Sequence, residues 1–375
     1  MKPPLLIISP FFPPKRGGLA DHTERLAQAM SAGNEVTVLT SAGGADGSGY
    51  RLQASIRDWG DGGALLAAIE QASPRGPILW QYVPHMYGRG GANLQLPGVM
   101  AELARRGRRQ LLIAHEIAAR YSPWPQRFYF AWAQRRQWRT IVPSMDFVGI
   151  STEAWLEPWC AWWPEARAKF VLLPSPSSVP LAAMPENHRG QWRERHGLSA
   201  DTRIIAYFGS TGAGKQFPWV MEAWRRAAAG PDKVALAVMG GESKMNAGER
   251  SAGLLQLGYL PPEEVSATLQ AADILALPFD DGVSERRTSA MAGLQHGCAV
   301  VTTVGANTGP TFRRAEFIRA TDAADPEEFN TAVVNVLADE ALRVRLGSAG
   351  RVAYERDYSW PVVAGRLESA LAKMR

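Results

Sequence analysis

The chain has 375 residues, 46% of them hydrophobic, which is enough for two domains with full cores. Its net charge of +5 and pI of about 9.3 favour a small anionic ligand or an anionic membrane surface. Because no lysine run or zinc-knuckle spacing occurs, we predict no nucleic acid partner. No 18-residue apolar stretch exists, which argues against a membrane-spanning helix.

The chain has two cysteines, Cys160 and Cys298, and no CxxC motif, which indicates a reducing compartment. A single disulfide between them is the alternative. The apolar start of the chain is broken by prolines, and its charges follow the apolar run. We therefore interpret it as a first strand and not as a signal peptide, and expect a cytoplasmic protein.

Short apolar runs alternate with helix-like segments along the first half of the chain. They predict buried parallel strands at residues 5–9, 35–39, 78–82, 111–114 and 147–150. A second series follows the proline- and serine-rich passage 172–180, with strands at residues 204–208, 235–239, 255–257, 274–277 and 299–302. This alternation predicts an α/β fold of two Rossmann-like, doubly wound domains, residues 1–178 and 179–356. Facing domains of this kind leave a cleft at the carboxyl ends of their strands.

Three features of the first half are candidates for function. Gly17 and Gly18 follow the first strand, where glycines let the backbone approach a ligand or simply make a turn. His115 follows the strand at 111–114 and is either a cleft residue or a structural histidine, while His85 is a weaker candidate of the same kind. His22, His188 and His196 are expected at the surface.

A tryptophan- and arginine-rich region covers residues 120–139 and 154–164. Trp155, Trp159, Trp162 and Trp163 are spaced for one apolar helix face, which core packing explains. Peripheral contact with a bilayer is the alternative hypothesis, because interfacial helices combine tryptophan with arginine.

The segment GSTGAGK, residues 209–215, lies between a predicted strand and a helix that begins near Pro218. It is one residue short of a phosphate-binding P-loop, since Gln216 stands where a magnesium-binding hydroxyl is needed. Amides at such a junction, together with Lys215, indicate an anion site. An ordinary turn is the alternative, and a nucleoside triphosphatase is disfavoured.

The loop DDGVSERR, residues 280–287, follows another predicted strand. Arg286 and Arg287 suit a diphosphate through their fork geometry, and Ser284 is expected to cap the helix that begins near Thr288. An ion-pair cluster with Asp281 and Glu285 is the alternative. Adjacent aspartates point in opposite directions without a third ligand, so we predict no metal site.

In sum, the order of these motifs resembles the GT-B glycosyltransferases, and most closely the family 4 group of retaining, nucleotide-sugar-dependent enzymes. The resemblance rests on the following segments, in this order: PPKRGGLADHTERLA, LWQYVPHMYGRGG with LLIAHEI, YFGSTGAGKQF, LGYLPPEEVSATLQAADILALPF, GVSERRTSAMAGLQHGCAVVTT and YERDYSW. It implies that the C-terminal helix, residues 357–375, returns to the first domain.

The resemblance also implies a function: transfer of a sugar from a nucleotide-diphosphate sugar to a hydroxyl acceptor, with retention and without a metal or other cofactor. The acceptor would be a carbohydrate, a lipid-linked compound or a small molecule, in the synthesis of surface polysaccharide, glycolipid or glycosylated metabolite. The protein would act in the cytoplasm or at the inner membrane face.

The resemblance assigns roles to the candidate residues. Catalytic roles fall to His115, Lys215, Glu285 and Arg286. Donor and phosphate binding falls to Gly17, Gly18, Gly209, Ser210, Lys215, Ser284, Arg286, Arg287 and Thr288. Acceptor-side contacts fall to Arg16, His85 and Glu116.

Two departures from the family pattern are visible. Ser210 stands where many members have an arginine, and Arg286 with Arg287 would replace that charge. The family's E-x7-E glutamates align with Ser284 and Ala292, so ribose and base recognition differs here. A nucleotide-sugar epimerase of the same fold and a catalytically silent binding subunit are therefore the alternatives.

Overall fold

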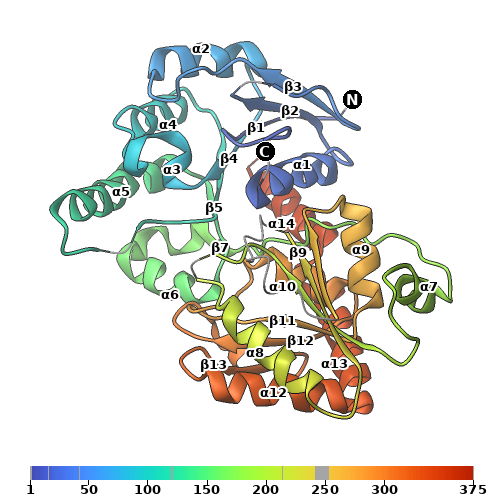
Figure 1. Ribbon diagram of the computed structural model, residues 1–375. Coiled ribbons are helices and arrows are strands. Elements are labelled where there is room, and N and C mark those ends of the chain that lie inside the picture. The colour runs from blue at the N-terminus through green and yellow to red at the C-terminus, as the bar shows by residue number, and fades with distance from the viewer. Residues whose placement is uncertain are drawn as a thin grey trace. The chain divides into compact units, whose positions relative to one another are not determined.

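The computed structural model divides into two compact units, Met1–Pro174 with Trp360–Arg375, and Ser175–Ser359 (Figure 1). It describes residues 2–15, 17–41, 43–119, 121–212, 214–240 and 253–374. Each unit is built on its own parallel sheet, so the predicted α/β class and the Rossmann-like organisation are confirmed.

The sheet of unit 1 has seven parallel strands in the order β3-β2-β1-β4-β5-β6-β7. The strands are β1 (Pro4–Ile8), β2 (Glu35–Thr40), β3 (Tyr50–Ala54), β4 (Ile78–Tyr82), β5 (Gln110–Ala114), β6 (Phe147–Ile150) and β7 (Phe170–Leu172). The helices are α1 (Gly18–Met30), α2 (Gly62–Ala72), α3 (Pro84–Tyr87), α4 (Leu96–Arg105), α5 (Pro125–Ser144), α6 (Glu153–Trp162) and α14 (Trp360–Lys373).

Alternate residues of the unit 1 strands bury into two separate apolar layers. On β1, Leu5 and Ile7 join the layer that includes side chains of α1 and α14, while Leu6 and Ile8 join the layer that includes α2, α4 and α5. Helices therefore cover both faces of the sheet, which explains why its central strands are apolar throughout.

The C-terminal helix α14 packs against α1 in unit 1, as the resemblance implies. Its buried residues Val363 and Leu367 lie in the same apolar layer as Leu26 and Met30 of α1. A π-helical turn, Tyr354–Tyr358, precedes it in unit 2. The chain thus completes the core of its first unit with its last helix.

The sheet of unit 2 has six parallel strands in the order β10-β9-β8-β11-β12-β13. The strands are β8 (Arg203–Phe208), β9 (Val234–Met239), β10 (Leu254–Gly258), β11 (Ile274–Leu277), β12 (Ala299–Val304) and β13 (Arg319–Asp322). The helices are α7 (His188–Arg195), α8 (Phe217–Ala228), α9 (Pro262–Ala271), α10 (Thr288–Gln295), α11 (Pro310–Arg313), α12 (Pro326–Ala338) and α13 (Glu340–Ala353).

The docking of α14 gives a test of unit 1's core. Leu367 is fully buried, so Leu367→Ala is expected to lower the free energy of unfolding by about 2–5 kcal/mol through lost contacts and a cavity. Val344→Ala, at a site that is 64% exposed, is expected to change it by less than about 0.5 kcal/mol. Chemical denaturation would measure both variants, and equal effects would show that α14 adds nothing to the core.

Candidate active site

The glycine–lysine loop and the arginine loop follow neighbouring strands of unit 2. The first follows β8 and the second follows β11, and these two strands pair in parallel. The sheet adds β9 on one side of this pair and β12 on the other, so its winding reverses between β8 and β11. Ligands of open parallel sheets bind beyond the carboxyl ends of the strands at such a reversal. Topology therefore brings together two segments that lie about 70 residues apart in the sequence.

The backbone of the first loop turns sharply between β8 and α8. Gly209 has φ 143°, a conformation that favours glycine, and its amide donates to the Met239 carbonyl over 3.0 Å. The Tyr207 hydroxyl donates to the Ser210 carbonyl over 2.5 Å, while Ser210 itself is exposed. Gln216 has φ 41° and directly precedes α8, whose first turn contains Pro218 as predicted. Lys215 is thereby placed at the start of this helix.

Three cationic side chains gather around one aromatic ring and one carboxylate. The Lys215 ammonium lies 4.7 Å from the centre of the Phe279 ring, and the Arg287 guanidinium lies 4.4 Å from it. Arg286 forms an ion pair of 3.1 Å with Asp281, and Arg287 forms a second, shorter pair with the same carboxylate. These ion pairs join the two arginines to Asp281, one of the two carboxylates that the ion-pair alternative names.

These neighbours change the pKa of the charged groups. Burial, aided by Arg287, lowers the pKa of Lys215 to about 8. Burial alone would raise the pKa of Asp281, but Arg287, Asn307 and Arg286 outweigh burial and lower it. Lys215 therefore shares its surroundings with positive charges that a bound anion would stabilise.

Ser284 does not cap α10, contrary to expectation. The helix begins at Thr288, the capping position is Arg287, and no side chain caps it. The reason is a turn before the helix, in which the Arg287 amide donates to the Ser284 carbonyl over 3.0 Å. Ser284 and Glu285 are both fully buried, and the Glu285 carbonyl accepts from the Ser175 amide over 3.0 Å.

Two residues of this site were not predicted from the sequence. Phe279 lies beside two of the cations, and its amide donates to the Thr303 hydroxyl over 2.8 Å. Asn307 donates its side-chain amide to Asp281 over 2.7 Å. The place of Phe279 directly after a strand and Pro278 is a signal that could have indicated it, whereas nothing in the local sequence indicates Asn307.

In unit 1, the predicted glycines lie at the start of α1. Gly17 precedes the helix with φ 144°, a conformation that favours glycine, and Gly18 is its first residue. The ammonium of Lys15 lies 3.4 Å from the centre of the Phe11 ring. Arg16, predicted on the acceptor side, lies outside the described residues.

His115 directly follows β5 and is half-buried, as its position in the sequence indicated. Its Nε2 lies 2.5 Å from Oε1 of Gln81, a fully buried residue of β4. The ring of His22 meets it edge-on at a centroid distance of 4.6 Å. His22 was expected at the surface, but it is buried, and burial lowers its pKa to about 4. His85 on α3 and Glu116 are exposed.

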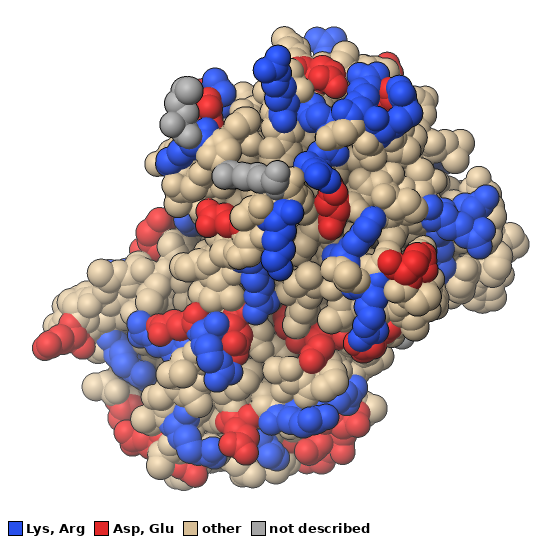
Figure 2. All heavy atoms as spheres, turned by 180° about the vertical axis from the view of Figure 1, so that it is seen from behind, with Lys and Arg blue, Asp and Glu red and all other residues tan. Residues whose placement is uncertain are grey.

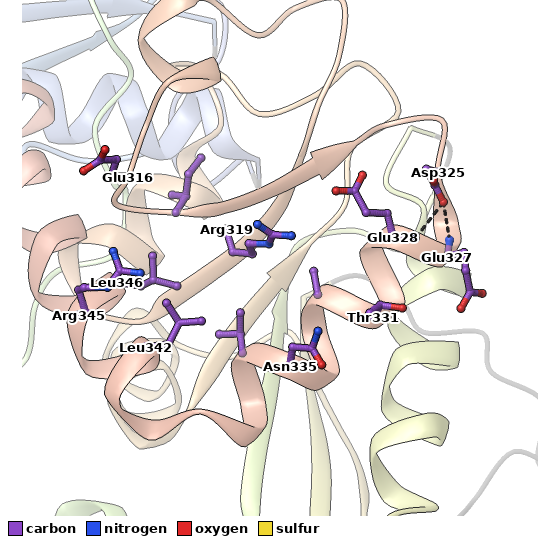
Figure 3. A pocket seen from close by; sticks show the side chains of 13 residues that line it. Glu316, Arg319, Asp325, Glu327, Glu328, Thr331, Asn335, Leu342, Arg345 and Leu346 are labelled. Atoms are coloured by element: carbon purple, nitrogen blue, oxygen red, sulfur yellow. Dashed lines mark hydrogen bonds between the residues drawn. The ribbon is translucent and has the colours of Figure 1, made fainter.

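A separate hollow of about 790 Å³ lies beside β13, α12 and α13 in unit 2 (Figure 3). Asp325 accepts from the amides of Glu327 and Glu328 there, at 3.0 and 2.9 Å. Its charged lining consists of Glu316, Asp325, Glu327, Glu328, Arg319 and Arg345. Because acidic groups outnumber basic ones, this hollow is a poor candidate for a phosphate ligand.

Two further findings concern the described part of the chain only. No group of three or more His, Cys, Asp and Glu residues there is placed to hold a metal ion. No described helix is long and apolar enough to cross a membrane.

Comparison with known proteins bears on this site. Residues 202–339, inside unit 2, match the family model of the group 1 glycosyl transferases. No curated protein matches the sequence.

Several solved structures resemble the whole chain. They include WaaG, a glycosyltransferase involved in lipopolysaccharide biosynthesis, at 17% identity, 98% coverage of both chains and a TM-score of 0.67. A sucrose-phosphate synthase from Thermosynechococcus elongatus has 16% identity, coverage of 100% and 99%, and a TM-score of 0.73. HepE from Anabaena, in complex with UDP-glucose, has 12% identity, coverage of 98% and 99%, and a TM-score of 0.71. At these identities the likeness shows the fold.

The family match covers both loops of the candidate site, and the fold match covers both units. The resemblance drawn from the sequence motifs is thereby confirmed. The chain has the GT-B fold, and residues 202–339 of its second unit match the group 1 glycosyl transferases.

Proposed function

We propose that the chain transfers a sugar from a nucleotide-diphosphate sugar to a hydroxyl acceptor, with retention of configuration. The observation that carries this proposal is the gathering of Lys215, Arg286 and Arg287 beyond the carboxyl ends of β8 and β11. HepE, a neighbour in fold, has been solved in complex with UDP-glucose, which supports a donor of this class.

In the proposed reaction, negative charge develops on the departing diphosphate when the bond to the sugar breaks. Lys215 and the two arginines stabilise this charge, which is the role of preorganised cations in such reactions. Because Asp281 already neutralises part of the arginines' charge, the diphosphate competes with that carboxylate for Arg286 and Arg287. No metal or other cofactor enters the proposed mechanism.

The remaining candidate residues receive supporting roles in this proposal. In unit 1, His115, with Gln81 holding its Nε2, contacts the transferred sugar or the acceptor. Gly17 and Gly18 let the backbone approach the ligands, and Glu116 and His85 are exposed toward an acceptor. Glu285, which is buried and directly precedes the two arginines in the sequence, keeps its proposed catalytic role in the transfer.

The acceptor in this proposal is a carbohydrate, a lipid-linked compound or a small hydroxyl compound. The product is a surface polysaccharide, a glycolipid or a glycosylated metabolite. We place the reaction in the cytoplasm or at the inner membrane face, since both cysteines are free and buried.

The proposal is tested first by isothermal titration with UDP-, GDP- and ADP-sugars. A transferase binds one of them and hydrolyses it slowly when no acceptor is present. A nucleotide-sugar epimerase would convert the donor without any acceptor. If none of the three nucleotide sugars binds, a catalytically silent subunit is favoured. Ser284 and Ala292, which stand at the expected glutamate positions, would agree with that result.

Lys215→Ala is expected to weaken the affinity for a nucleoside diphosphate by about tenfold or more, corresponding to about 1.4 kcal/mol or more. The reason is the loss of a partly buried ammonium that faces the proposed diphosphate. Lys233→Ala is the matched control, because Lys233 is exposed and pairs with Asp201 on the surface. Titration calorimetry would measure both, and unchanged affinity in Lys215→Ala would remove this residue from the site.

The affinity should also depend on pH in a defined direction. Since the pKa of Lys215 is lowered to about 8, its ammonium is charged below that pH and loses its proton above it. We therefore expect the dissociation constant of the nucleoside diphosphate to increase between about pH 7 and pH 9. Lys215→Arg keeps its charge and should flatten this dependence; an identical profile would show that another group titrates.

A further inference from the structure

The helix α5 exposes aromatic side chains on the face that does not contact the core. The set is Phe128, Tyr129 and Trp132 on the helix, Tyr121 and Trp124 just before it and Trp162 from α6, with exposed fractions between 47% and 68%. We call these six residues the aromatic patch. Trp124, Phe128 and Trp132 follow at intervals of four residues, which places them along one side of the helix.

The aromatic patch is carried by a firmly anchored helix. Another side of α5 faces the core, where Trp138 is fully buried and donates its indole NH to the Ile117 carbonyl over 3.0 Å. Gln134 is also buried, and its side chain binds the Ala119 amide and the Gly90 carbonyl, at 2.6 and 2.7 Å. The helix therefore has two apolar faces, of which only one is covered by the unit. Exposed apolar surface of this extent marks an interaction site.

Arginines adjoin the aromatic patch without acidic neighbours in the sequence. Residues 117–145 contain five arginines and no aspartate or glutamate. Arg127, Arg136 and Arg139 are exposed, and their side chains form no ion pair or hydrogen bond with the described residues. In the rear view, basic side chains gather on the lobe at the right edge, where α5 of Figure 1 lies (Figure 2).

A hollow of about 450 Å³ is lined by both aromatic and arginine side chains of this region. It is lined by Tyr121, Trp132, Arg135, Arg136, Arg139, Trp162 and Trp163. Arg135 is fixed in it, because its guanidinium lies 4.1 Å from the centre of the Tyr121 ring and donates to the Ala119 carbonyl over 2.7 Å. The lining offers three guanidinium groups between aromatic walls and contains no carboxylate. This chemistry suits a phosphate group that is attached to an apolar chain.

We propose that α5 and the neighbouring end of α6 bind the surface of an anionic lipid bilayer. The aromatic patch inserts at the level of the headgroups, and the hollow takes the phosphate of one lipid. Tryptophan and tyrosine favour the bilayer interface, and arginine beside them is attracted to anionic lipid. This inference extends beyond the proposed glycosyl transfer, since binding to lipid requires no turnover.

The arrangement favours a bilayer over two other partners. Along α5 the aromatic residues 124, 128 and 132 come first, with Arg127 among them, and the arginines 135, 136 and 139 follow, so most of the cationic groups lie toward the C-terminal side of the exposed aromatic ones. A bilayer has separate apolar and charged zones, whereas a nucleic acid strand alternates bases with phosphates and favours interleaved groups. A second copy of the chain would bring arginines against arginines, which disfavours self-association through this face.

The test is flotation of the full-length protein with vesicles of phosphatidylcholine alone and of phosphatidylcholine mixed with phosphatidylglycerol. We expect binding to the mixed vesicles and little binding to the neutral ones. Arg136→Gln combined with Arg139→Gln should weaken binding about 30-fold, if each arginine contributes as basic residues near anionic membranes usually do. Trp124→Ala combined with Phe128→Ala should weaken it by about tenfold or more.

Matched control variants distinguish binding through this site from nonspecific electrostatic or hydrophobic binding to vesicles. Arg314→Gln with Arg345→Gln removes two exposed positive charges from unit 2, and Tyr259→Ala removes an aromatic side chain that is 61% exposed there. Both should leave vesicle binding unchanged. The patch residues are exposed, so thermal unfolding should be unaltered in the α5 variants, which excludes misfolding as the cause of any loss.

Several results would overturn the proposal. They are absence of binding to both kinds of vesicle, equal binding to neutral and anionic vesicles, and equal losses in the α5 variants and the unit 2 controls. Binding to a single-stranded oligonucleotide in preference to vesicles, lost with Arg136→Gln and Arg139→Gln, would assign the surface to nucleic acid instead. Concentration-dependent dimers that the Trp124→Ala and Phe128→Ala changes abolish would assign it to a second copy.

Discussion

Repulsion among three cations is the constraint on which the candidate active site depends. Lys215 and Arg287 both lie within 4.7 Å of the centre of one phenyl ring, and Arg286 shares a carboxylate with Arg287. Burial is the larger cause of the lowered pKa of Lys215, and the like charge of Arg287 held close to it adds to this shift. Asp281 and the Phe279 ring offset this repulsion.

The fold determines why these charges meet. Adjacent parallel strands end at the same edge of a sheet, and β8 and β11 are adjacent although β9 and β10 separate them in the sequence. Close contacts at one glycine, with a backbone amide and with a side-chain hydroxyl, fix the arginine loop further. Gly282 has φ 83°, and a β-carbon there would lie 2.2 Å from both the Gly305 amide and the Thr308 hydroxyl. The loop after β12, which also supplies Asn307, therefore supports the loop that carries Asp281.

Sequence patterns predicted the interior strands of each sheet but missed most of the edge strands. Strands buried on both faces, such as β4 and β6, were predicted with their observed bounds, because continuous apolar runs mark them. The strands β3, β7 and β13 were not predicted, and each lies at the edge of its sheet. Edge strands such as β3 (YRLQA) and β13 (RATD) keep polar, exposed residues, so they lack the apolar run.

The same distinction applies to the site. Lys215, Arg286 and Arg287 were found from local motifs, because glycines and charges beside a strand end are visible in the sequence. Asn307 and Gln81 depend on contacts between distant segments, 26 and 34 residues away from their partners, which no local pattern encodes. His22 was placed wrongly for a related reason. The residues that flank it in the sequence, Asp21 and Thr23, are polar, which suggested an exposed position. In the structure, α14 comes from the far end of the chain, and the ring centroids of Trp360 and His22 lie 5.0 Å apart.

The two positions that the resemblance aligns with the family's glutamates bear on how the proposed donor would be recognised. Ser284 and Ala292 are both fully buried in unit 2, and Ala292 lies on α10 among apolar core residues such as Met291 and Leu294. A carboxylate introduced at Ala292 would have to be buried, which is strongly unfavourable without a partner. If the proposed donor carries a ribose, Ala292 therefore offers that ribose no carboxylate.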